Sequence, residues 1–307
     1  MSRHGFAAMT YHRPVMLKEC LEGLNIDPEG TYVDATFGGG GHSMAILSQL
    51  KGGRLVSFDQ DPDAAKEAEK ITHRSFTFCQ ANFRYLKQYL KLHGVTRVNG
   101  ILADLGVSSH QIDAPERGFS TRFSGPLDMR MDTHGKITAA TILNGYTEEK
   151  LHKILGMYGE LKNARSAARE IVSARAGRKL ATTLDLKEAL RKVAPKGKEN
   201  KYFAQVFQAL RIEVNEEMQA LEDFLHQCEV ISPGGRLVVM SYHSLEDRMV
   251  KNYLATGKVF GEQEKDLYGN VIRPFDSVNR KPREASEEEV GENARARSAK
   301  LRIGERR

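Results

Sequence analysis

The chain has no tryptophan and only three cysteines among its 307 residues. Cys20, Cys79 and Cys228 lie far apart, and no C-x-x-C pair occurs. This spacing argues against a disulfide framework and against a thiolate zinc site, and we expect no metal. No run reaches the roughly 18 apolar residues that a membrane helix needs. Nor do the first nine residues form the apolar segment of a signal peptide, so the sequence predicts a cytoplasmic protein without a membrane partner.

The most informative stretch runs from residue 31 to residue 61. Residues 31–36 alternate in the manner of a buried strand, which carries Asp34. Four glycines, at positions 38–41, lead into an apolar-periodic run that predicts a helix. A second strand is predicted over residues 54–58, and Asp59 follows it directly. A strand, a glycine turn, a helix and a second strand are the start of an α/β fold with a parallel sheet.

This stretch has the chemistry of a nucleotide-like cofactor site. Glycines let the backbone approach a ligand closely, and the following helix offers free N–H groups at its positive end. Asp59 is placed to accept hydrogen bonds from ribose hydroxyls. The dinucleotide fingerprint G-x-G-x-x-G fails, because the sixth position counted from Gly38 is Ser43. Asp34, just ahead of the glycines, suits a ligand with an amino group, so we favour S-adenosylmethionine over a nicotinamide cofactor.

Further strands extend the same sheet. They are predicted over residues 76–79, 100–104 and 236–240, and Asp104 ends the second of these. Carboxylates that end parallel strands share one edge of the sheet, where open α/β folds bind their ligands. Residues 202–226 have the apolar spacing of one long amphipathic helix, and residues 299–303 are apolar enough for an edge strand.

Residues 112–200 interrupt this alternation, because they lack strand patterns. Helices are predicted here over residues 138–143, 148–157, 162–176 and 183–193. Residues 113–213 hold 19 Lys and Arg against 12 Asp and Glu, whereas the rest of the chain holds 27 against 28. We therefore predict an α/β domain of residues 1–112 plus 202–307 that binds the cofactor, and an inserted, basic helical domain of residues 113–201. A basic segment in an otherwise neutral protein indicates a polyanionic partner.

Several motifs resemble those of the bacterial 16S ribosomal RNA (cytosine-N4)-methyltransferase family. The most specific are D-x-T-x-G-x-G-G-H-S at 34–43, D-L-G-V-S-S at 104–109, F-Q-A-L-R-I-E-V-N at 207–215 and S-Y-H-S-L-E-D-R at 241–248. Shorter matches lie at residues 12–16, 59–62, 117–120, 125–132, 233–236 and 295–298. Together they extend over nearly the whole chain. Ala294 replaces a usual proline, and Gly39 occupies a variable position of the glycine run.

The resemblance implies a class I (Rossmann-like) S-adenosylmethionine-dependent methyltransferase sheet with an inserted helical domain. It also implies methylation of N4 of a cytidine in the decoding region of 16S rRNA, within the small ribosomal subunit, and leaves a homodimer open. The predicted cofactor residues combine those that the family implies with Asp34 and Gly38 from the reasoning above. They are Asp34, Gly38, Gly40, Gly41, His42, Asp59, Phe83, Asp104 and Gln111.

Candidate catalytic residues follow from the chemistry of an exocyclic amine. Its lone pair is conjugated with the ring, so acceptors on its N–H groups would turn the lone pair toward the methyl group. Ser108 and Ser109 are candidate acceptors, with Asp104 shared between cofactor and amine, although either serine would also suit a helix cap. His243 is a candidate base for the released proton or a structural histidine.

Two other classes of function remain open at this point. One is an RNA-binding ribosome-assembly factor that keeps a methyltransferase-like fold without turnover, which transfer of a labelled methyl group would exclude. The other is a nicotinamide-dependent oxidoreductase, which the missing third glycine of the fingerprint disfavours.

Overall fold

The computed structural model describes residues 14–261 and 263–307, so His12 of the first motif lies outside the described residues. Seven strands form one sheet in the order β3-β2-β1-β4-β5-β7-β6. The strands are β1 (Thr31–Asp34), β2 (Arg54–Asp59), β3 (Phe76–Gln80), β4 (Val98–Asp104), β5 (Ile231–Ser241), β6 (Phe275–Ser277) and β7 (Lys300–Arg306). β1 to β5 pair in parallel, and β7 runs antiparallel to both β5 and β6. This arrangement confirms the predicted class I α/β fold.

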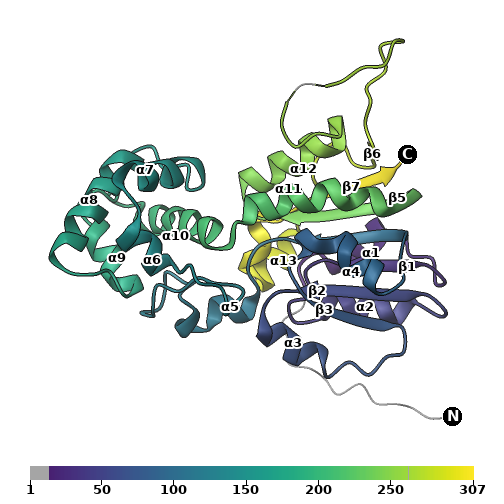
Figure 1. The fold of residues 1–307 in the computed structure, drawn as a ribbon, viewed down its shortest axis with the longest axis horizontal. Helices are drawn as coiled ribbons and strands as arrows, with labels where there is room; N and C mark the ends of the chain where they lie inside the picture. The colour runs from purple at the N-terminus through teal and green to yellow at the C-terminus, as the bar shows by residue number, and fades with distance from the viewer. Residues whose placement is uncertain (1–13, 262) are drawn as a thin grey trace.

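Helices cover both faces of the sheet, which explains why its strands are apolar at consecutive positions (Figure 1). Val238 and Met240 of β5 face one core with α1 and α2, whereas Leu237 and Val239 face the other with α4, α11 and α12. These helices are α1 (Leu17–Leu24), α2 (Gly41–Gln49), α4 (Leu86–Leu92), α11 (Glu217–Gln227) and α12 (Ser244–Thr256). Shorter helices are α3 (Pro62–Ala68), α5 (Ser109–Asp113) and α13 (Glu287–Glu292). Within the described ranges, no helix is both long and apolar enough to cross a membrane.

A second group of helices, inserted between β4 and β5, lies to one side of the sheet (Figure 1). It comprises α6 (Ala139–Gly145), α7 (Glu148–Met157), α8 (Ala164–Gly177), α9 (Thr183–Leu190) and α10 (Glu199–Asn215). These helices bury a hydrophobic core of their own, to which α10 contributes residues from Tyr202 to Leu210. We therefore propose that the inserted domain runs from about residue 113 to residue 215, beyond the boundary at residue 201 that the sequence suggested.

The prediction of one long helix over residues 202–226 is wrong. Glu216 adopts the left-handed conformation, with φ 49° and ψ 37°, and separates α10 from α11. The apolar stripe continues across this break because Leu210 packs in the inserted core and Leu221 packs against the sheet. A single sequence pattern thus serves two different cores.

The prediction of an edge strand at residues 299–303 is also wrong in its position. The strand exists as β7, but it lies inside the sheet between β5 and β6. The edge is β6, which is only three residues long and includes Asp276 and Ser277. Such a short, polar strand has no periodicity from which it could have been predicted.

Candidate functional site

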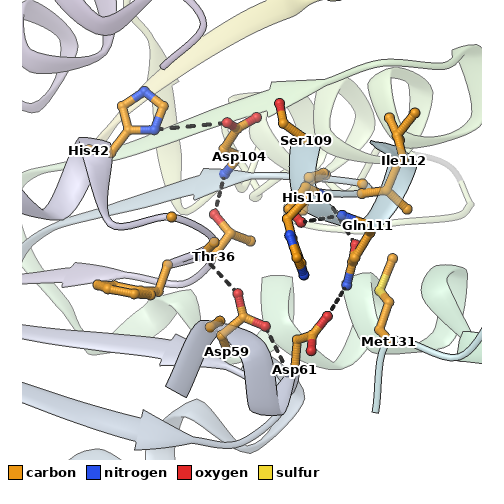
Figure 2. A pocket seen from close by; sticks show the side chains of 18 of the residues that line it. Thr36, His42, Asp59, Asp61, Asp104, Ser109, His110, Gln111, Ile112 and Met131 are labelled. Atoms are coloured by element: carbon orange, nitrogen blue, oxygen red, sulfur yellow. Dashed lines mark hydrogen bonds and ion pairs between the residues drawn. The ribbon is translucent and has the colours of Figure 1, made fainter. Parts of the chain in front are cut away.

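A cavity of about 370 Å³ opens at the carboxyl ends of the parallel strands (Figure 2). Its walls come from the segments that follow β1, β2, β3 and β4, together with Tyr242 after β5. Met131 and Arg211 reach the cavity from the inserted domain, and Arg295 reaches it from the segment after α13. Segments far apart in the sequence therefore meet at the edge where the strand-end acids were predicted to lie.

Most of the predicted site residues line this cavity. They are Gly38, Gly41, His42, Asp59, Phe83, Asp104, Ser108, Ser109 and Gln111. Asp34, Gly40 and His243 do not line it. The first two support the wall from behind, whereas His243 belongs to a different cluster.

The glycine turn is shaped by close contacts that exclude side chains. Gly40 has φ 79°, and a Cβ placed on it would lie 2.7 Å from the ring of Phe37. Behind the turn, the fully buried carboxylate of Asp34 accepts hydrogen bonds from Ser43 Oγ at 2.6 Å and from the Thr36 amide at 3.1 Å. Asp34 therefore holds the turn to the first turn of α2, and it does not contact the cavity itself.

Asp59 shapes the cavity at the end of β2. Its Oδ2 accepts a hydrogen bond from the Gly38 amide at 2.8 Å, and its Oδ1 accepts one from the Asp61 amide at 2.9 Å. Burial nevertheless raises the pKa of Asp59 to about 6. Each oxygen keeps a second lone pair, so the carboxylate remains able to accept from the hydroxyls of a ribose.

Asp104 lies between two ring-bearing side chains. Its Oδ1 accepts a hydrogen bond from the Tyr242 hydroxyl at 2.8 Å, and its Oδ2 lies 3.8 Å from His42 Nδ1. Burial lowers the pKa of His42 to about 4, so its ring is neutral. We assign the ring proton to Nε2, which lies 3.3 Å from the Val15 carbonyl, an acceptor only. Nδ1 of His42 then has a lone pair that faces Asp104 Oδ2. A ligand N–H group placed between these two acceptors could donate to both.

Three acids of this edge, Asp34, Asp59 and Asp104, have no lysine or arginine partner among the described residues. Burial raises the pKa of Asp34 to about 6 and that of Asp104 to about 7. Across residues 14–261 and 263–307, neither these two nor Asp59 forms an ion pair with lysine or arginine. Buried carboxylates favour the approach of a cation. A ligand with a sulfonium and an ammonium group, such as S-adenosylmethionine, fits this cavity.

A buried ion-pair network closes the side of the cavity near α5. Arg117 donates to Asp61 Oδ2 at 2.8 Å and to Asp63 Oδ2 at 3.0 Å, and it also donates to the carbonyls of Arg130 and Met131. Gln111 Nε2 donates to Asp61 Oδ2 at 2.6 Å (Figure 2). The network connects the end of β2 to the beginning of the inserted domain.

The two predicted serines differ in their surroundings. Ser108 is the N-cap of α5, because its hydroxyl accepts from the backbone amide of Gln111, and its own backbone amide donates to Gln111 Oε1. Its oxygen is thus already engaged in the capping role that the sequence left open. Ser109 lines the cavity as the first residue of α5.

His243 is placed away from the cavity, as the N-cap of α12. Its Nδ1 accepts from the Glu246 amide at 3.4 Å, and its Nε2 lies 3.1 Å from Glu246 Oε1. The structure therefore supports the structural alternative for this histidine. Its neighbour Tyr242, within the same S-Y-H-S motif, is the residue that reaches Asp104.

The functional residues that sequence reasoning missed are Thr36, Asp61, Arg117, Arg211, Tyr242 and Arg295. All six lie inside motifs that were recognised, so a signal existed. It did not separate side chains that face the cavity from those that cap helices.

The raised pKa of Asp104 leads to a prediction about pH. An ionised carboxylate attracts a cation and accepts hydrogen bonds more strongly than a protonated one, so we expect kcat/KM at limiting cofactor to fall as the pH drops below about 7. The Tyr242 hydroxyl lowers the pKa of Asp104, and Tyr242→Phe should therefore move the profile to higher pH. Tyr268→Phe, at a side chain 90% exposed, should leave it unchanged. Equal midpoints for all three proteins would contradict this role of Tyr242.

Comparison with known proteins identifies the family. The model of the MraW methylase family matches residues 9–307. The chain belongs to this family. The methylase is 59% identical to the ribosomal RNA small subunit methyltransferase H of Cytophaga hutchinsonii, over 96% of this chain and 99% of that protein. It is 54% identical to the protein of the same name from Bacteroides thetaiotaomicron, over 97% and 98% of the two chains. The resemblance drawn from the motifs is thus confirmed.

Similarity to solved structures is much weaker. An rRNA methylase from Streptococcus thermophilus aligns with a TM-score of 0.40 and 14% identity, over 97% of this methylase and 99% of that chain.

Proposed function

We propose that this protein transfers the methyl group of S-adenosylmethionine to N4 of a cytidine in the decoding region of 16S rRNA, within the small ribosomal subunit. The observation that carries the proposal is near full-length similarity to two ribosomal RNA small subunit methyltransferases H, at 59% and 54% identity. The cavity supports it, because its buried acids suit a cationic cofactor. These intact acids disfavour a factor without turnover.

In this proposal the cavity residues divide the work between donor and acceptor. S-adenosylmethionine supplies an electrophilic methyl group. Asp59 holds the ribose, the bare backbone at Gly38 and Gly41 holds the amino-acid part, and Phe83 covers the adenine. Asp104 accepts a hydrogen bond from the N4 amine, which directs the lone pair toward the methyl carbon. It also takes the proton that N4 loses as the N–C bond forms and the sulfonium S–C bond breaks.

The inserted domain is proposed to grip phosphates beside the target. Five basic side chains are exposed on its surface: Arg165, Arg169, Lys196, Lys198 and Lys201. Several exposed positive charges on one domain suit binding to the phosphates of an RNA backbone. Arg175, another arginine of the basic segment, instead donates to the Leu143 carbonyl at 2.6 Å. Arg178 forms an ion pair with Asp185. We therefore assign Arg175 and Arg178 to the fold of the insertion. The other five are kept as phosphate contacts, since the only ion pair that they form within the described part of the chain, Arg169 with Glu148 at 4.0 Å, is exposed and weak.

Removing two of these charges should flatten the salt dependence of RNA binding. Each lost phosphate contact lowers the slope of log K against log salt by about 1, so Arg165→Ala combined with Arg169→Ala should lower it by about 2. The measurement is a filter-binding series from low to high salt with small ribosomal subunits. Arg74→Ala, exposed but outside the insertion, is the matched control. An unchanged slope in the double variant would exclude this face.

The proposed activity is tested with S-adenosylmethionine labelled in its methyl group. Small subunits from a strain whose own gene for this methylase is deleted serve as substrate, and naked 16S rRNA is compared with them. Nucleoside mass spectrometry should find N4-methylcytidine and one S-adenosylhomocysteine per methyl group. Tight binding of subunits without transfer would support the assembly-factor alternative instead. Light scattering of the same protein preparation tests the homodimer that the sequence left open.

A further inference from the structure

Arg211 is the residue of the F-Q-A-L-R-I-E-V-N motif that reaches the cavity. It lies on α10, so it brings a positive charge from the inserted domain into the site on the sheet. Its side chain is only 15% exposed. The function proposed above assigns no role to Arg211.

The guanidinium is fixed on one side and open on the other. Nε donates to Glu217 Oε1 and Nη2 donates to Glu217 Oε2, both at 2.8 Å. The ion pair raises the pKa of Arg211, so the group stays charged despite its burial. Nη1 makes no hydrogen bond to any residue in the described part of the chain. A planar group held by two of its three nitrogens presents the third in a fixed direction.

Nη1 points to the loop that follows β4. A Cβ placed on Gly106 would lie 4.0 Å from Nη1 and 3.8 Å from the ring of Tyr242. Gly106 has φ 94°, which favours glycine, and this leaves bare backbone between the aromatic ring and the guanidinium. Tyr242 in turn donates to Asp104 Oδ1. Arg211 thus lies on the Tyr242 side of Asp104, whereas His42 and the glycine turn lie on the Oδ2 side.

We propose that Arg211 reads the pairing edge of the target base by donating to N3 and O2 of cytosine. The proposal rests on the function proposed above and adds a determinant of specificity to it. Cytosine presents an N4 donor next to the N3 acceptor, which matches a carboxylate from Asp104 beside a guanidinium from Arg211. Uracil presents the opposite order, a carbonyl at C4 and an N–H at N3. With uracil, the buried Arg211 guanidinium would face N3–H, which is another donor, and would have no acceptor. Such an unpaired donor discriminates strongly against uracil.

The test combines a change in the enzyme with a change in the base. Small subunits are reconstituted with 16S rRNA that carries either cytidine or 3-deazacytidine at the target position. The altered base keeps N4 but lacks the N3 acceptor, and its different amine reactivity affects every enzyme variant equally. Arg211→Met should lower the ratio of kcat/KM for cytidine over 3-deazacytidine by about tenfold or more relative to the wild-type protein. S-adenosylhomocysteine affinity should stay within about threefold.

Two further variants keep the test decisive. Arg211→Lys retains the charge without the planar fork and should give an intermediate ratio, which serves if Arg211→Met does not fold. Arg191→Met removes an arginine of the inserted domain that is 78% exposed and pairs with Glu188, and should leave the ratio unchanged. An unchanged ratio in Arg211→Met would overturn the proposal. Such a result together with about tenfold weaker S-adenosylhomocysteine binding would assign Arg211 to the cofactor carboxylate. Failure of the wild-type protein to methylate cytidine would count against the function itself.

Discussion

Replacing Asp104 by alanine is expected to lower the single-turnover rate of methyl transfer by about a hundredfold or more, equivalent to about 2.7 kcal/mol. The carboxylate occupies the centre of the site, where Tyr242 donates to one oxygen and His42 faces the other. Alanine would remove the acceptor for the N4 amine and for the released proton at once. Rapid-quench measurement at saturating cofactor separates this loss from weaker cofactor binding.

Asp104→Asn is the matched variant, because it preserves the shape of the side chain and an oxygen that accepts from Tyr242. It lacks the negative charge, so it should fall between the wild-type and alanine proteins. Calorimetric titration with S-adenosylhomocysteine reports cofactor binding for each variant. A near wild-type rate in both variants at saturating cofactor would remove Asp104 from the chemistry.

Arg117→Met is expected to lower the free energy of unfolding by about 3–5 kcal/mol, the range for breaking a buried ion pair by removing one partner. The side chains of Arg117 and Asp61 are only 9% and 5% exposed. Methionine would leave the buried Asp61 carboxylate with Gln111 as its remaining side-chain donor. It would also leave the carbonyls of Arg130 and Met131 without the guanidinium. Urea denaturation followed by circular dichroism measures the change.

Arg122→Met provides the comparison for this experiment. Arg122 is 62% exposed and pairs with Asp113 at 3.2 Å, so its removal should change stability by less than about 1 kcal/mol. Adding Asp61→Asn to Arg117→Met should recover part of the lost stability, because the unpaired charge disappears. Equal stabilities of Arg117→Met and Arg122→Met would show that the buried network does not stabilise the fold.

The sheet and its ligand edge were predictable because their signals are local. Each parallel strand is a short apolar run, and Asp34, Asp59 and Asp104 mark where three of them end. The order of elements along the chain then places these ends on one edge. The glycine turn was equally visible, since a strand, glycines and a helix follow one another without interruption.

What the sequence could not supply is the direction of individual side chains. Tyr242 and His243 are adjacent in one motif, yet one reaches Asp104 and the other caps α12. The outcome depends on where β5 ends and α12 begins, which propensities fix only to within a residue or two. The break at Glu216 escaped prediction for a related reason. Glu216 adopts a left-handed conformation although it is not a glycine, and tertiary contacts such as that with Arg84 maintain it. The local sequence therefore does not indicate this break.

The bend at Glu216 sets α10, which packs in the inserted domain, at an angle to α11, which packs against the sheet. A glutamate in this conformation is strained by about 1 kcal/mol relative to glycine, and Arg84 clamps its side chain at 2.6 Å while also holding Asp223 of α11. Arg84, from the segment after β3, thus supports the angle between α10 and α11 through ion pairs with Glu216 and with Asp223. Under the proposed function, an RNA held by the inserted domain would therefore approach the cavity on the sheet from a set direction.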